Sequence, residues 1–286
     1  MKVAVTAANG QLGTCIVELL IKEIGSENIV GTARNPTKAE HLGISIMQGD
    51  YNSKADFDAA LKGIDVVLIV SGMDAPDKRI IQHRNIINAA RDAGVRKIVY
   101  TSVVGEEGSS SFDAIVQSNR QTERDIRESG LQWVIGRNGL YIEPDVAYIE
   151  TYKKDGKVAN CAGDGLCSYT TRSELACAYV QMILNDDRNA KTFNLAGKAI
   201  SQSQLTAYLN EAFGTRLVYE AMSPEAYLSL QEKTNGEFLG KIIAGIYTKI
   251  RNGEFHIHSN FEAAAGRKHL EWTDYFNALK QSQGPL

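Results

Sequence analysis

The sequence has little proline, little cysteine and no long hydrophobic run. Five prolines among 286 residues, with no low-complexity tract, argue against disordered linkers. Four irregularly spaced cysteines, at positions 15, 161, 167 and 177, favour reduced thiols over a disulfide scaffold. No stretch approaches the ~20 apolar residues that a membrane span needs, and the amino-terminal apolar run is too short for a secretion signal. We therefore expect a compact cytoplasmic protein.

An excess of charge of one sign is also missing. The 31 lysines and arginines against 34 acidic residues leave a formal net charge of −3. This balance gives no electrostatic reason to expect a nucleic acid or an anionic membrane as partner. With 43% hydrophobic and 23% charged residues, the composition is that of an ordinary globular protein with enough apolar material for a large core.

The first 140 residues alternate short apolar runs with longer amphipathic ones. The apolar runs predict strands at Val3–Thr6, Ile29–Ala33, Ile44–Gln48, Val66–Val70, Ile98–Thr101 and Trp133–Gly136. The stretches between them predict helices at about 11–24, 53–62, 78–93 and 112–129, and Gly94 and Gly130 follow the last two. Nearly continuous apolar strands separated by helices indicate a parallel sheet buried on both faces, the doubly wound α/β pattern of a Rossmann fold.

The pattern changes after about residue 141. We expect helices near 143–154 and 172–185, a strand at Thr192–Ala196, and then helices at Gln202–Phe213, Pro224–Thr234 and Glu237–Ile250. This predicts a Rossmann domain over residues 1–141, with returning segments to about residue 200. A smaller, mainly helical lobe would comprise about 142–172 and 200–286.

A glycine loop follows the first predicted strand and opens the first helix. Its spacing is G-x-x-G-x-x-G with Ala7 in the first position, followed by Gly10 and Gly13. Gly10 would let the backbone approach a pyrophosphate, Gly13 would let the helix pack close to the strand, and the helix N-terminus would attract the anion. Because Ala7 carries a Cβ, we expect it to adopt ordinary φ and ψ angles. The loop predicts dinucleotide contacts from Thr6, Ala7, Ala8, Asn9, Gly10, Gln11, Leu12 and Gly13.

The end of the second strand carries Arg34, about 20 residues past the loop, with Lys38 one turn further on. NAD-selective folds usually place an acidic residue here to bind the ribose 2′-hydroxyl, whereas a guanidinium can pair with a 2′-phosphate. NADP(H) is therefore favoured over NAD(H), although use of both stays open, as does an exposed arginine that merely opens a solvated helix. Asp50 after the third strand and Ser71-Gly72-Met73 after the fourth reach the same edge, and we expect them to contact the cofactor.

Several motifs together resemble the NmrA-like atypical short-chain dehydrogenases, and most of all their NAD(P)H:quinone oxidoreductase type 2 members. They are Asn9-Gly10-Gln11-Leu12-Gly13, Ala33-Arg34-Asn35-Pro36, Gln82-His83-Arg84-Asn85, Ala93-Gly94-Val95, Tyr100-Thr101-Ser102 and Arg137-Asn138-Gly139. The resemblance covers residues 1 to about 200 and is weaker beyond. It implies a Rossmann domain that binds NADPH, a small substrate lobe and two-electron reduction of quinones. It also implies that Arg137, Asn138, Gly139 and Tyr141 line the nicotinamide end, that Arg172 lies on the cofactor side, and that Asn138 and Tyr141 position the substrate.

The chain departs from this group where a proton donor should be. Typical short-chain dehydrogenases use a Tyr-x-x-x-Lys pair, and helix alignment places Ile115 and Asn119 at those two positions. Carbonyl reduction is therefore disfavoured, but a quinone is already electrophilic and can be reduced by hydride transfer without a dedicated acid. The alternative is a non-catalytic NADP(H) redox sensor that acts through a protein partner. A homodimer stays open.

One further signal is weak. His256 and His258 would lie on one face of a strand, but no third or fourth metal ligand is suitably spaced. We expect neither a metal nor a flavin. The partner we expect is a small-molecule substrate, most naturally a quinone.

Overall fold

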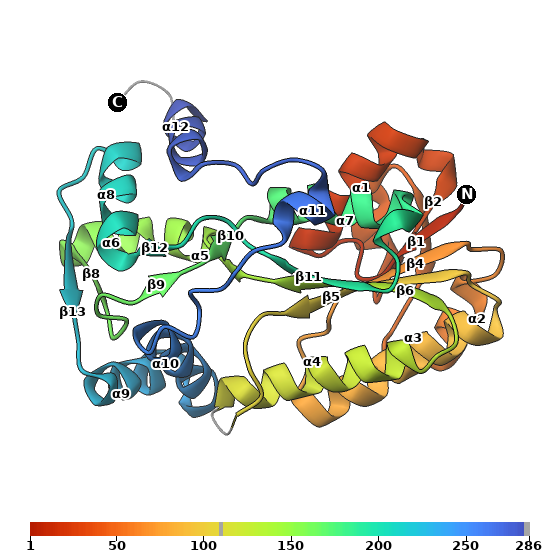
Figure 1. Ribbon diagram of the computed structural model, residues 1–286, viewed down its shortest axis with the longest axis horizontal. Helices are drawn as coiled ribbons and strands as arrows, with labels where there is room; N and C mark the ends of the chain where they lie inside the picture. The colour runs from red at the N-terminus through yellow and green to blue at the C-terminus, as the bar shows by residue number, and fades with distance from the viewer. Residues whose placement is uncertain (109–110, 283–286) are drawn as a thin grey trace.

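A seven-stranded parallel sheet forms the centre of the computed structural model, which describes residues 1–108 and 111–282 (Figure 1). The strand order is β3-β2-β1-β4-β5-β6-β11, and every neighbouring pair is parallel. The strands are β1 (Val3–Val5), β2 (Ile29–Ala33), β3 (Ser45–Gln48), β4 (Val66–Ile69), β5 (Lys97–Val103), β6 (Gln132–Asn138) and β11 (Lys191–Leu195). This confirms the predicted Rossmann fold and puts the reversal of strand order between β1 and β4, where such sheets bind ligands.

Helices cover both faces of this sheet, as Figure 1 shows. One face carries α1 (Gln11–Ile24) and α7 (Arg172–Leu184), which pack on each other in one hydrophobic core. The other carries α2 (Lys54–Ala60), α3 (Pro76–Asp92) and α4 (Ser111–Arg127), and a second core lies between these helices and the strands. The central strands are buried on both sides because their residues are almost continuously apolar. Short 3₁₀ turns complete this part: η1 (Ser26–Asn28), η2 (Pro36–Leu42) and η3 (Asp186–Arg188).

A separate core holds most of the C-terminal half together. Its helices are α5 (Glu143–Ala147), α6 (Ile149–Asp155), α8 (Gln202–Phe213), α9 (Pro224–Asn235), α10 (Glu237–Arg251) and α12 (Trp272–Ser282). Short two-stranded ribbons pair β7 (Leu140–Tyr141) with β10 (Tyr169–Thr170), β9 (Leu166–Cys167) with β12 (Ile200–Ser201), and β8 (Lys157–Asn160) with β13 (Val218–Ala221). The division into a cofactor domain and a substrate lobe stays a prediction.

Three details of the C-terminal half differ from the sequence expectations. The helix expected near 143–154 is two helices, which meet at Tyr148. His256 and His258 are not on a strand, so the expectation that both rings share one strand face was wrong. The short helix α11 (Phe261–Ala265) returns to the sheet and packs on α7, so part of the segment assigned to the lobe joins the N-terminal core.

Within the described ranges, no helix has the length and apolarity needed to cross a membrane. The same residues contain no group of three or more His, Cys, Asp or Glu side chains arranged to hold a metal ion.

Candidate cofactor and active site

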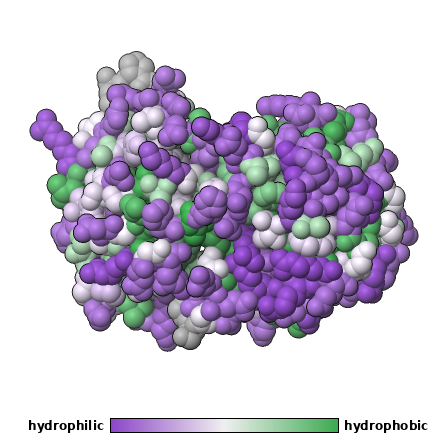
Figure 2. Space-filling view, viewed as in Figure 1, coloured by the Kyte–Doolittle hydropathy of each residue, from purple (hydrophilic) through white to green (hydrophobic). Residues whose placement is uncertain are grey.

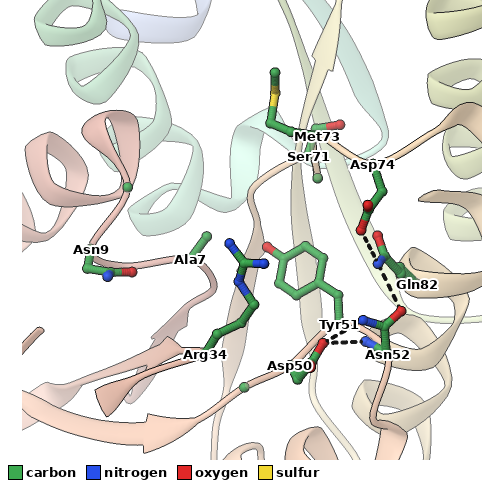
Figure 3. A pocket seen from close by; sticks show the side chains of 13 residues that line it. Ala7, Asn9, Arg34, Asp50, Tyr51, Asn52, Ser71, Met73, Asp74 and Gln82 are labelled. Atoms are coloured by element: carbon green, nitrogen blue, oxygen red, sulfur yellow. Dashed lines mark hydrogen bonds between the residues drawn. The ribbon is translucent and has the colours of Figure 1, made fainter. Parts of the chain in front are cut away.

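A cavity of about 510 Å³ opens at the carboxyl ends of β1, β2, β3 and β4 (Figure 3). It lies at the point where the strand order reverses. Eight of the residues expected to contact a cofactor line it: Ala7, Asn9, Gly10, Arg34, Asp50, Ser71, Gly72 and Met73. Five residues that were not predicted to contact a cofactor complete the wall: Gly49, Tyr51, Asn52, Asp74 and Gln82.

The glycine loop forms one wall of the cavity and shows why small residues are needed there. Ala7 has φ +47°, so the expectation of ordinary backbone angles was wrong: it adopts the left-handed conformation that usually requires glycine. A Cβ on Gly13 would lie 2.4 Å from the Ala7 carbonyl oxygen, and one on Gly10 would lie 3.1 Å from it. Gly13 thus allows the close approach of α1 to the loop, and Gly10 keeps the cavity side open.

The N-terminus of α1 is available to an anion. Gly10 is its N-cap, and among the described residues no side chain caps it and no acidic residue lies in its first turn. The N–H groups of Gln11, Leu12 and Gly13 therefore have no carbonyl partner within the helix. An uncapped helix end beside a glycine loop fits a pyrophosphate group.

The other residues of the predicted loop support it from behind. The Thr6 hydroxyl accepts a hydrogen bond from the Val70 N–H at 2.9 Å and lies 2.6 Å from the Tyr51 hydroxyl. Ala8 and Leu12 are buried in the core, and the Ala8 N–H donates to the Thr32 carbonyl. These three residues fix the loop, but their side chains do not line the cavity.

Arg34 follows β2 and extends into the cavity, as Figure 3 shows. It is exposed, and its carbonyl accepts a hydrogen bond from Gln48. Lys38, in the η2 turn, is exposed but is not part of the cavity wall. Arg34 thus remains the candidate partner of a 2′-phosphate, whereas the structure gives Lys38 no place in the wall.

Opposite the glycine loop, a hydrogen-bonded chain of polar side chains lines the cavity (Figure 3). The Gln82 amide donates to Asp74 at 2.6 Å and to Asn52 at 3.0 Å, and Asn52 in turn donates to Asp50. The bond from Gln82, with Lys78 and Arg34 nearby, lowers the pKa of Asp74. The wall therefore presents fixed acceptors to the hydroxyl and amino groups of a nucleoside.

A buried histidine holds the loop after β4. The Gly72 N–H donates to His83 Nε2 at 3.0 Å, so this nitrogen is unprotonated and Nδ1 carries the hydrogen, which it donates to Thr122. Burial, with the charge of Arg79, lowers the pKa of His83 to about 3 and keeps the ring neutral. The Ser71 N–H is held by the Thr101 hydroxyl, while Met73 is 94% exposed at the cavity mouth.

A second group of predicted residues meets at the end of β6. Tyr179 donates to the side-chain amide oxygen of Asn138, and the Asn138 side-chain amide nitrogen donates to the Tyr141 hydroxyl at 3.2 Å. The Arg172 guanidinium lies over the Tyr141 ring, 4.8 Å from its centre, and pairs with Glu143 at 3.5 Å. Burial, opposed by the bond from Asn138, raises the pKa of Tyr141. Asn138 is buried behind half-buried Tyr141, so it orients the phenol from behind.

Arg137 and Gly139 are not part of this group. Arg137 makes two hydrogen bonds to Glu123, on the α4 face of the sheet. Gly139 is buried, donates its N–H to Leu195, and a Cβ on it would lie 2.7 Å from the Ser168 carbonyl. Both residues support the fold around β6, and their role at the nicotinamide end stays a prediction.

The α4 positions that would carry a Tyr-x-x-x-Lys pair have structural roles. Ile115 packs in the C-terminal core. Asn119 is buried, and its carbonyl oxygen accepts hydrogen bonds from Tyr100 at 2.6 Å and Ser71 at 3.1 Å. The Asn119 amide donates to the carbonyl of Ile115. This part of α4 therefore offers no acid for catalysis.

A family model described as NAD(P)H-binding matches residues 7–186, which include the whole cavity wall. The chain belongs to this NAD(P)H-binding family. It is 35% identical over 225 residues to quinone oxidoreductase 2 of Escherichia coli, covering 77% of this chain and 78% of that protein. An NmrA-like family domain-containing oxidoreductase of Aspergillus flavus is 28% identical over 236 residues, covering 80% and 76%.

Solved structures agree with these relatives. The NADPH complex of the E. coli quinone oxidoreductase superimposes with a TM-score of 0.88 at 30% identity, covering 97% of this chain and 99% of that one. The NADP(H) complex of a Citrobacter triphenylmethane reductase gives a TM-score of 0.88 at 28% identity, covering 98% of this chain and 100% of that one. This member of the NAD(P)H-binding family is thus an NmrA-like oxidoreductase enzyme related to quinone oxidoreductase 2.

Proposed function

We propose that the protein transfers hydride from NADPH to quinones or similarly flat electrophiles. The preference for NADPH over NADH is inferred from the cavity wall, where an uncapped helix end lies beside Arg34. The helix end suits the pyrophosphate, and the guanidinium suits a 2′-phosphate where NAD-selective folds place a carboxylate. Asp50, Asn52 and Gln82 would hold the adenosine.

Because α4 offers no acid, we infer a substrate whose reduction needs little acid catalysis. Reduced nicotinamide supplies the hydride, so the protein chiefly orients the two reactants and excludes water. A quinone becomes aromatic on reduction, and its developing oxyanion can be met by a hydrogen-bond donor. Tyr141 can serve as this donor, because its hydroxyl already accepts from Asn138 and keeps its own proton for another acceptor. The names of the relatives, a quinone oxidoreductase and a triphenylmethane reductase, agree with flat acceptors.

The test is an absorbance assay of NADPH consumption with benzoquinone or menadione. We expect turnover well above the buffer rate, and a lower rate at the same concentration of NADH. Gly10→Val is the matched negative control, because its side chain would project beside the Ala7 carbonyl into the cavity. Absence of turnover, combined with tight and redox-dependent NADP binding, would contradict the proposal and favour the sensor alternative.

A further inference from the structure

The loop after β4 leaves one apolar side chain in solvent at the mouth of the cofactor cavity. Met73 is 94% exposed, and the next most exposed large hydrophobic side chain in the described ranges is Phe238 at 67%. The face of the molecule in Figure 2 is mostly hydrophilic, and hydrophobic side chains gather on it in the hollow between the two halves. Met73 thus differs from the other apolar side chains in its exposure, and it is also part of the cavity wall.

The backbone on both sides of Met73 is held in place. The Gly72 N–H donates a hydrogen bond to His83 at 3.0 Å, and the Asp74 carbonyl accepts one from Arg79 at 3.1 Å. His83 and Arg79 both come from α3 and are buried, so this helix fixes the loop above the cavity. The exposure of Met73 is therefore set by a fixed backbone, and only its side chain is free to turn.

Met73 lies where a bound dinucleotide would leave the cavity. Arg34 and Asp50 follow β2 and β3 in one half of the sheet, whereas Met73 follows β4, the first strand of the other half. Figure 3 shows the Met73 thioether at the rim, where it extends away from Arg34 and Asp50. With adenosine beside those two residues and pyrophosphate at Gly10, the other half of the dinucleotide would continue on the β4 side. The flexible thioether can then fold onto it.

We propose that Met73 is a redox-sensitive cover of the cofactor site, which folds over the bound dinucleotide as a thioether but not as a sulfoxide. This rests on the proposed NADP(H) site and is independent of the acceptor. The oxidant is hydrogen peroxide. A lone pair of the sulfur forms the S–O bond as the O–O bond breaks, and the other oxygen leaves as water with both protons. The sulfur loses two electrons and the peroxide gains them.

Oxidation removes the property on which the cover depends. A thioether is apolar and polarisable and packs well on a nucleotide, whereas a sulfoxide is polar and would lose hydration in the same place. The oxidised protein should therefore bind the cofactor more weakly. The change is reversible, because methionine sulfoxide reductases return the thioether and release water while a dithiol becomes a disulfide. Cofactor affinity would thus fall in peroxide and recover after repair.

The first test follows the oxidation of single methionines by peptide mass spectrometry. The protein is treated with dilute hydrogen peroxide, with and without saturating NADP+. NADP+ should slow the oxidation of Met73 at least about fivefold, because nearly all of the protein is then in the bound form. Met1 is the internal control: it is 48% exposed and precedes β1, at the opposite edge of the sheet, so its rate should not change. Equal rates for Met73 in both samples overturn the proposal.

The second test measures cofactor affinity by calorimetry before and after peroxide. Oxidation should weaken NADP+ binding to the wild type about three- to tenfold, the scale of a sulfur–ring contact, and sulfoxide reductases should restore it. Met73→Leu keeps an apolar side chain without a thioether, so whatever its starting affinity, peroxide should change it less than about twofold. Met222→Leu replaces a half-buried methionine of the C-terminal half and should respond to peroxide as the wild type does.

The outcomes separate this inference from the proposed function. If Met73→Leu loses as much affinity on oxidation as the wild type, the cover is overturned and the NADP(H) site stays intact. An untreated wild-type protein that binds neither NADP+ nor NADPH overturns the proposed site, and the cover with it.

Discussion

Removing the buried carboxylate of Glu123 tests whether the α4 face is structural. Glu123 has no exposed surface, and its oxygens accept hydrogen bonds from Arg120, Arg127, Arg137 and Ser102. Burial acts to raise the pKa of this carboxyl, but the hydrogen bond from Arg137 and the charge of Arg120 outweigh it and lower the pKa to about 2. The perturbation is Glu123→Gln, which keeps the shape and removes the charge.

The magnitude follows from the pKa difference. A value of 4.5 in the unfolded chain and about 2 in the folded protein differ by about 2.5, and each pKa unit corresponds to about 1.36 kcal/mol. Ionised Glu123 thus stabilises the fold by about 3 kcal/mol, within the range for a broken buried ion pair. Because the folded-state pKa is the lower one, this stabilisation is complete above about pH 4.5. It is lost as the pH falls towards about 2.

The assay is urea unfolding of wild type and Glu123→Gln, followed by circular dichroism from pH 7 to pH 3. We expect the variant to be about 3 kcal/mol less stable at pH 7, and the gap to shrink below about pH 4.5. Glu107→Gln is the matched control: its ion pair with Arg124 is nearly half exposed, so it should cost under about 1 kcal/mol. A gap under about 1 kcal/mol at pH 7 for Glu123→Gln, or one that widens on acidification, would refute the reasoning.

Four substitutions test the cofactor cavity by calorimetric titration and thermal unfolding. Arg34→Ala should weaken NADPH binding by about 1–3 kcal/mol and leave NADH binding nearly unchanged. Lys38→Ala is the control and should affect the binding of neither cofactor. Equal losses for both cofactors after Arg34→Ala would show that Arg34 does not bind the 2′-phosphate. Ala7→Gly relieves a left-handed alanine conformation that costs about 1–2 kcal/mol, but it makes the unfolded chain more flexible, which costs about 0.4–1 kcal/mol. A net gain in stability of up to about 1.5 kcal/mol is therefore expected, and a clear loss of stability would contradict this. Gly13→Ala should destabilise the fold by about 1–3 kcal/mol and weaken the binding of both cofactors, because its Cβ would meet the Ala7 carbonyl. Unaltered binding would mean that the loop is not the pyrophosphate site.

The long elements were predictable from the sequence because their periodicity is clear. Helices α1 and α8 and strand β2 have the bounds that the apolar pattern predicted, and the other long elements of the first half agree to within a few residues. The ribbons of the C-terminal half were not predicted, because their strands of two to four residues do not alternate regularly with helices as the similarly short β1, β3 and β4 do. The break between α5 and α6 at Tyr148 has no glycine or proline to signal it.

Predicted site residues that stand just after a strand are among those that line the cavity. Arg34, Asp50 and Ser71 all line the cavity, because the ends of parallel strands meet at one edge. Gln82 was noted only as part of a family motif and not as a site residue, because it reaches the cavity from within α3, which only tertiary packing decides. Neighbouring strand residues point to opposite faces, so the side chains of Arg137 and Asn138 lie on different sides of the sheet.

The position of the acid is the point at which this chain differs most from typical short-chain dehydrogenases. In those enzymes, the helix that corresponds to α4 supplies the proton. In this chain, Asn119 accepts hydrogen bonds from Tyr100 and Ser71, and arginines keep Glu123 ionised. These bonds, together with the bond from Arg137 to Glu123, connect α4 to β5, β6 and the loop after β4. A side chain that must hold its hydrogen bonds to keep strands in place cannot also exchange protons during turnover. A hydrogen bond to the developing oxyanion would therefore have to come from outside α4, either from solvent or from Tyr141, whose hydroxyl accepts from Asn138 and keeps its own proton.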